Sequence, residues 1–186
     1  MINKIILLFM FMMGLTFSAS SPEEKSVEDL FNSYVKSDEF KNEYVETGIA
    51  QMYGIMGQKG KMFETDMDKS EIDSKMASVL ETNFSGFKIE VKDIKTNKNG
   101  EIELTINLEG KDILNPLETN IISSTSQQIV KPEKFIGDFS RYMRMYSPSK
   151  KKFKITYTMQ DTEWKLKEDN DIKLLSALLL VKNFSE

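Results

Sequence analysis

Residues 87–110 read FKIEVKDIKTNKNGEIELTINLEG, and they carry the clearest structural signal in the chain. On both sides of Asn99-Gly100, apolar residues alternate with charged or polar ones, which is the period of a half-buried β-strand. An Asn-Gly pair between two such segments is a strong signal for a tight hairpin. The apolar side shifts by one residue near Asp93, which indicates a β-bulge. We therefore predict an antiparallel hairpin with one buried face and one wet face.

A second alternating stretch lies closer to the C-terminus. Residues 152–159 read KFKITYTM, residues 163–167 read EWKLK, and a short turn at Gln160-Asp161-Thr162 separates them. This pattern predicts a second antiparallel hairpin. Two hairpins with one apolar face each predict an α+β fold, in which helices pack on one face of an antiparallel sheet of about four strands.

The rest of the chain shows helical spacing of apolar residues. After a polar lead-in over residues 20–25, we predict a helix from Ser26 and a second one across residues 40–56. The second helix is weakened and ended by its glycines, which are Gly48, Gly54, Gly57 and Gly60. Residues 57–68 are expected to form a loop. Further predicted features are a helix from Ser70, helical structure over 115–147 with a break at Pro132, and a last helix from Asp171 with Ile172, Leu175, Leu178, Leu179 and Val181 on its apolar face.

Residues 1–19 have the pattern of a secretory signal peptide. Lys4 is followed by an apolar run over residues 5–17 and then by small residues around Ala19. The run is shorter than the about 20 residues that a spanning helix needs, which favours a cleaved signal peptide. The alternative is an uncleaved N-terminal anchor. We predict cleavage after the small residues, a single α+β domain over residues 20–186, no stable membrane span after cleavage, and export to the periplasm, the cell envelope or the medium.

The composition excludes several kinds of chemistry. Among 186 residues there is no cysteine and no histidine, which removes disulfides, thiolate nucleophiles, imidazole bases and the common zinc sites. With 25 Lys+Arg against 29 Asp+Glu, the chain lacks the basic character of most nucleic-acid binders, so we expect no nucleic-acid partner. Asp66 and Asp68 begin a calcium-loop pattern, but Glu71 occupies the position that needs glycine. We predict no metal site, no cofactor and no catalytic residues.

The C-terminal hairpin ends in Asp161-Thr162-Glu163-Trp164-Lys165-Leu166. With the signal peptide, the N-terminal helices and the Lys/Glu-alternating hairpin, this ending resembles small exported bacterial proteins with a cystatin-like or nuclear-transport-factor-2-like cone. The resemblance implies binding of a ligand or partner in the cone rather than catalysis. It supplies no site residues, and the lipidation cysteine that many such proteins carry is absent here.

One cluster stands out as a candidate site. Methionine adapts its shape and recurs at surfaces that accept varied apolar ligands. The candidate ligand-binding residues gather where glycines interrupt a helix, and they are Met52, Tyr53, Met56, Met62 and Phe63. The alternative is ordinary core, because methionines and aromatics at helical spacing are usually buried.

These features predict an exported, non-catalytic domain that binds a partner protein or a small apolar ligand. A structural protein of the cell envelope or surface is the first alternative, since the alternating Lys/Glu face can serve solubility alone. A hydrolase that uses two carboxylates is the second, although no pair of acids stands out from the sequence.

Overall fold

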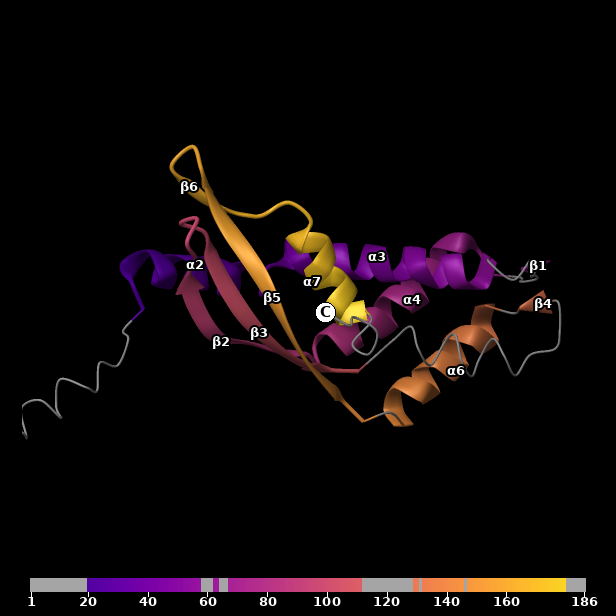
Figure 1. The fold of residues 1–186 in the computed structure, drawn as a ribbon. Helices are drawn as coiled ribbons and strands as arrows, with labels where there is room; N and C mark the ends of the chain where they lie inside the picture. Colours follow the sequence, from indigo (N-terminus) through magenta and orange to yellow (C-terminus); the bar gives the residue numbers. More distant parts are fainter. Residues whose placement is uncertain are drawn as a thin grey trace, which may run out of the picture.

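The computed structural model describes residues 20–57, 62–63, 67–111, 129–130, 132–145 and 147–179. These residues form an α+β fold with a four-stranded antiparallel sheet, as predicted (Figure 1). The elements are α2 (Pro22–Tyr34), α3 (Asp38–Gly57), β1 (Met62–Phe63), α4 (Lys69–Phe84), β2 (Lys88–Thr96), β3 (Ile102–Gly110), β4 (Ile129–Val130), α6 (Pro132–Met145), β5 (Ser149–Gln160), β6 (Glu163–Leu166) and α7 (Asn170–Leu179).

Both predicted hairpins are confirmed, and they join into one sheet with the order β2-β3-β5-β6. The junction pairs β3 with β5, from Ile102 opposite Tyr157 to Gly110 opposite Ser149, although α6 lies between them in the sequence. The predicted bulge is also present, because the β2–β3 register shifts between Val91 and Asp93. Gly100 has a φ of +76° at the first hairpin turn, a conformation that glycine adopts without strain.

The sheet has one buried and one wet face, as its alternation requires. Helix α2 packs against β2 and β3, and α7 packs against β5, while α3 lies against α4 and α7. The buried face of the two central strands comprises Ile102, Leu104, Ile106, Leu108, Phe153, Ile155 and Tyr157. On the wet face, Glu103 of β3 pairs with Lys95 of β2 at 3.7 Å and with Lys154 of β5 at 2.9 Å.

The predicted polar lead-in over residues 20–25 is wrong, since α2 begins at Pro22. Ser21 accepts a hydrogen bond from the Glu24 amide at 3.1 Å, and the Glu24 carboxylate accepts one from the Ser21 amide at 2.9 Å. This reciprocal capping box, with proline in the first turn, starts the helix before Ser26. Glu24 also accepts hydrogen bonds from the amide and hydroxyl of Thr96, so it ties α2 to the end of β2.

A pair of short strands and the start of α4 also differ from the prediction. Met62–Phe63, in the predicted loop, pair in parallel with Ile129–Val130, in the predicted helical stretch. Neither strand could be predicted, because two residues are too few to show a periodicity. Helix α4 begins at Lys69, one residue early. The predicted helix from residue 115 lies mostly outside the described residues. The predicted break at Pro132 is confirmed, because α6 starts there.

The predicted apolar face of α7 is partly wrong. Ile172 is 61% exposed, whereas Leu174, Ala177 and Leu178 are buried. Positions i, i+3 and i+4 share one face of a helix, and Ile172, two residues before Leu174, points away from that face.

Helix α3 continues through Gly48 and Gly54 and has Gly57 as its last residue. Across the described residues, none of the helices combines the length and the apolar character needed to cross a membrane. The predicted signal peptide over residues 1–19 lies outside the described residues.

Candidate functional site

Of the predicted methionine and aromatic site, the structure describes the side chains of Met52 and Tyr53. Met52 is fully buried on α3, while Tyr53 is only partly buried. Met56 is on α3, and Met62 and Phe63 form β1, but their side chains lie outside the described set. Met52 is therefore a core residue and Tyr53 packs at the edge of the core, and the predicted ligand site stays a prediction.

Tyr53 belongs to a polar group that links α3 to α4. Its hydroxyl donates a hydrogen bond to the Asp73 carboxylate at 2.6 Å, and Lys69 pairs with the same carboxylate at 2.5 Å. The Lys69 ammonium also lies 5.2 Å from the centre of the Tyr53 ring. Burial, followed by the hydrogen bond to Asp73, raises the pKa of Tyr53 to about 12. These contacts give Tyr53 a structural role at the helix pair.

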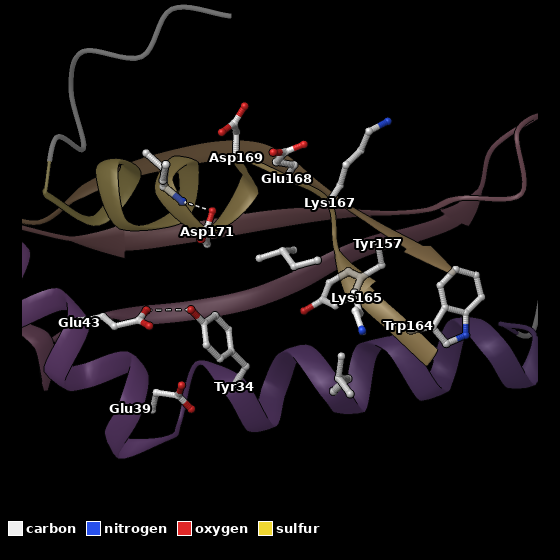
Figure 2. A pocket seen from close by; sticks show the side chains of 13 residues that line it. Tyr34, Glu39, Glu43, Tyr157, Trp164, Lys165, Lys167, Glu168, Asp169 and Asp171 are labelled. Atoms are coloured by element: carbon white, nitrogen blue, oxygen red, sulfur yellow. Dashed lines mark hydrogen bonds between the residues drawn. The ribbon is translucent and has the colours of Figure 1, made fainter. Parts of the chain in front are cut away.

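A pocket lies elsewhere, between the α2–α3 joint and the C-terminal hairpin (Figure 2). This pocket has a volume of about 620 Å³, and we name it the Tyr34–Trp164 pocket. It lies within the range of small-molecule sites, about 300–1,000 Å³. Its lining comprises Leu30, Tyr34, Glu39, Glu43, Tyr157, Trp164, Lys165, Leu166, Lys167, Glu168, Asp169, Asp171 and Ile172.

The helical wall of the pocket is held by Ser37 at the joint between α2 and α3. The Ser37 hydroxyl donates to the Tyr34 carbonyl at 2.7 Å and accepts from the Phe40 amide at 3.1 Å. It thus satisfies backbone groups of both helix ends. Across this joint the Tyr34 hydroxyl donates to the Glu43 carboxylate at 3.0 Å, and Figure 2 shows the two side chains facing each other.

The opposite wall comes from the second hairpin and the loop that follows it. Trp164 pairs with Met159 and Leu166 pairs with Tyr157, so Trp164 and Leu166 share the apolar side of β6. After β6 the chain turns back sharply, and Asp169 adopts a φ of +69° just before α7 begins.

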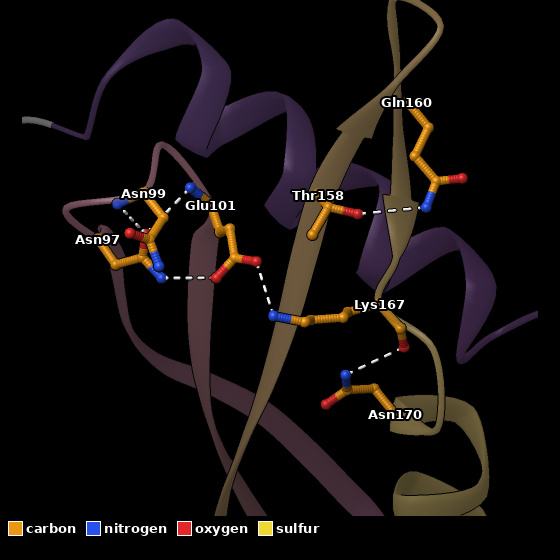
Figure 3. A network of polar contacts seen from close by, with 7 residues as sticks. All are labelled: Asn97, Asn99, Glu101, Thr158, Gln160, Lys167 and Asn170. Carbon is orange, nitrogen blue, oxygen red and sulfur yellow. Dashed lines mark hydrogen bonds and ion pairs between the residues drawn. The ribbon is translucent and has the colours of Figure 1, made fainter.

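Lys167, in this loop, is held on the outer side of the sheet. Its ammonium pairs with the Glu101 carboxylate at 2.7 Å, and Glu101 also accepts a hydrogen bond from Asn97 at 2.9 Å (Figure 3). The Lys167 carbonyl accepts a hydrogen bond from the Asn170 side chain at 3.0 Å. This network connects the pocket loop to the first hairpin turn.

The pocket combines an apolar and aromatic lining with a negative rim. Five carboxylates and two lysines line it, and one of those lysines, Lys167, already pairs with Glu101. Burial raises the pKa of Tyr34 above its ordinary range, and the hydrogen bond and charge of Glu43 and the charges of Asp171 and Glu39 raise it further. Leu30 and Ile172, at 46% and 61% exposed, present apolar surface at the same place.

Sequence reasoning missed this pocket because its walls come from opposite ends of the chain. Trp164 is only partly buried, and it lines the pocket. The available signal was the single tryptophan followed by the acidic run Glu168-Asp169. Nothing in the spacing indicates that Tyr34 lies opposite.

No group of three or more acidic side chains is placed to hold a metal ion in the part of the chain that the structure describes. Comparison with known proteins gives no match to a family model, to a curated protein or to a solved structure. The resemblance to cone-shaped exported domains stays a prediction, and function has to be inferred from the pocket itself.

Proposed function

We propose that the protein is an exported, non-catalytic binding protein that takes a basic, apolar segment of a partner protein into the Tyr34–Trp164 pocket. The observation that carries this proposal is the combination of partly buried aromatic side chains, exposed aliphatic side chains and five carboxylates around one pocket of about 620 Å³. Export rests on the apolar run over residues 5–17.

The apolar part of the pocket favours a ligand with its own apolar side chains. Burying exposed Leu30 and Ile172 removes apolar surface from water, which contributes about 25 cal/mol per Å². Trp164 and Tyr34 line the pocket with aromatic rings, and a cation over the face of such a ring gains about 0.5–1 kcal/mol at an exposed site.

The charges favour a basic ligand over an acidic one. Glu39, Asp169 and Asp171 have no cationic partner among the described residues, so a lysine or arginine of the partner can pair with them. An acidic ligand would meet like charges and is disfavoured. This complementarity points to a basic partner segment rather than to a neutral small molecule.

The single tryptophan supplies the assay, since Trp164 lines the pocket. A short amidated peptide of alternating lysine and leucine is titrated into the purified protein while Trp164 emission is followed. We expect a saturable change in emission that weakens as salt is added, because exposed charge pairs are screened. The matched peptide with glutamate in place of lysine is expected to bind at least about tenfold more weakly, a difference of about 1.4 kcal/mol.

Two variants of α3 separate the pocket from general charge effects. Glu39 lines the pocket, whereas Glu46 is exposed on the same helix and does not. Glu39→Lys is expected to weaken the basic peptide about fivefold, which corresponds to about 1 kcal/mol, and Glu46→Lys should leave it unchanged. Equal binding of both peptides would overturn the proposal, and saturation by octanol alone would show a small apolar ligand instead.

A further inference from the structure

A second pocket lies between α4 and α6, where Lys111 follows β3, and has a volume of about 400 Å³. We name it the α4–α6 pocket. Its lining contains no Asp or Glu among the described residues, in a chain with 29 of them. Val79, Met143 and Pro148 give it apolar walls, and Lys111 and Arg144 give it two cations.

Asn83 is the buried polar group of this pocket. Only 8% of it is exposed, and its amide nitrogen donates to the Tyr44 hydroxyl at 2.9 Å and to the Lys111 carbonyl at 3.5 Å. No described residue donates a hydrogen bond to its amide oxygen. Since buried polar groups nearly always have partners, this oxygen is suited to accept a hydrogen bond from a bound ligand.

The net charge of the pocket favours one bound anion. Both α4 and α6 end here, and each helix C-terminus carries roughly half a negative charge, about −1 for the two. Lys111, whose ammonium donates to the Met143 carbonyl, and Arg144 supply two positive charges. Arg144 forms no ion pair with any described residue. The balance of about +1 matches a single carboxylate.

We propose that the α4–α6 pocket binds a small carboxylate that has an apolar body and a hydrogen-bond donor. The carboxylate pairs with Arg144 and Lys111, the donor bonds to the Asn83 oxygen, and the apolar body lies on Val79 and Met143. A guanidinium and a carboxylate form two parallel hydrogen bonds in their best geometry, which gives Arg144 the larger part in anion binding. This site is independent of the Tyr34–Trp164 pocket and of the function proposed for it.

Three matched probes test each part of the ligand by isothermal titration calorimetry on the purified protein. They are 2-hydroxy-4-methylpentanoate, 4-methylpentanoate without the donor, and 4-methylpentanol without the carboxylate. We expect the hydroxy acid to bind at least about tenfold more tightly than either of the others, because a buried group left without its partner costs affinity. Equal affinities of the three, or no heat with any of them, would overturn the proposal.

Variants on the two helices show whether binding occurs at this place. Arg144→Gln is expected to weaken the hydroxy acid about tenfold and to leave the alcohol unchanged. Arg141→Gln is the control, because Arg141 is exposed on α6, pairs with Asp138 and does not line the pocket. Ser78 is exposed on α4 at the pocket, so Ser78→Phe should obstruct entry without disturbing the core. An equal effect of both arginine variants, or full binding by Ser78→Phe, would refute the site.

Discussion

Helix α3 contains two glycines with opposite surroundings, and this contrast gives a quantitative test of the helix packing. A Cβ atom added at Gly48 would lie 2.8 Å and 2.9 Å from the two terminal carbons of Leu80 on α4. A Cβ atom added at Gly54 would meet nothing within 4 Å. The same change, glycine to alanine, is therefore expected to stabilise the protein at Gly54 and to be neutral or destabilising at Gly48.

The magnitudes follow from two effects. Alanine is more favourable than glycine in a helix interior by about 1 kcal/mol, and this gain applies at both positions. At Gly48 the new methyl group forces Leu80 to move, and Leu80 is fully buried, so over-packing costs about 1–3 kcal/mol. Gly54→Ala should raise the free energy of unfolding by about 1 kcal/mol, and Gly48→Ala should lie about 1–3 kcal/mol below it.

Urea unfolding of the purified protein, followed by circular dichroism, measures both variants under the same conditions. The difference between them isolates the contact with Leu80, because the propensity gain cancels. A double-mutant cycle of Gly48→Ala with Leu80→Ala adds a direct test, since residues in contact couple by about 0.5–3 kcal/mol. If Gly48→Ala is as stable as Gly54→Ala and the cycle shows no coupling, α3 and α4 do not approach as described.

Three further predictions concern turns and charges. Thr162 has a φ of +74° in the second hairpin turn, a conformation that glycine adopts more easily than threonine. Thr162→Gly should therefore raise the free energy of unfolding by about 1 kcal/mol. An unchanged urea midpoint would contradict this turn. Hydrogen bonds from the Ser21 amide, and then from the hydroxyl and amide of Thr96, hold the pKa of Glu24 below its ordinary value. The carboxylate therefore stabilises the fold above its unfolded-state pKa. This contribution is lost as the pH falls through the lower, folded-state pKa. Glu24→Gln should therefore reduce the loss of stability below about pH 4, whereas Glu23→Gln, in the same turn, should follow the wild type. Asp73→Asn should lower the pKa of Tyr53 from about 12, measured by the absorbance of the phenolate in a difference titration, and an unchanged value would show that burial alone raises it.

The sheet could be predicted because its signal is local. Each hairpin joins segments that are adjacent in the sequence, so alternation and turn residues are enough to pair them. The bulge near Asp93 could also be predicted from the sequence, because one extra residue moves the following apolar side chains to the other face of the strand. The pairing of β3 with β5 was not predicted, because it depends on how the intervening segment packs.

Helix ends and short strands were harder to predict. The start of α2 is encoded locally, by a capping box of Ser21 and Glu24 with Pro22 in the first turn. The face of α7 was misassigned because leucines and isoleucine surround much of this helix, so periodicity alone does not identify the buried side. The pairing of Met62–Phe63 with Ile129–Val130 has no local signal at all.

The charge of the whole chain is a poor guide to the charge at its pockets. The formal net charge is −4, which suggests a mildly acidic protein with no preference for either sign of ligand. The fold instead places five carboxylates around the Tyr34–Trp164 pocket and none, among the described residues, in the lining of the α4–α6 pocket. Because exposed charges more than about 8–10 Å apart are largely screened at physiological salt, each pocket attracts ligands according to its own lining. Selection of a basic segment at one pocket and a carboxylate at the other is therefore compatible with one small, acidic chain.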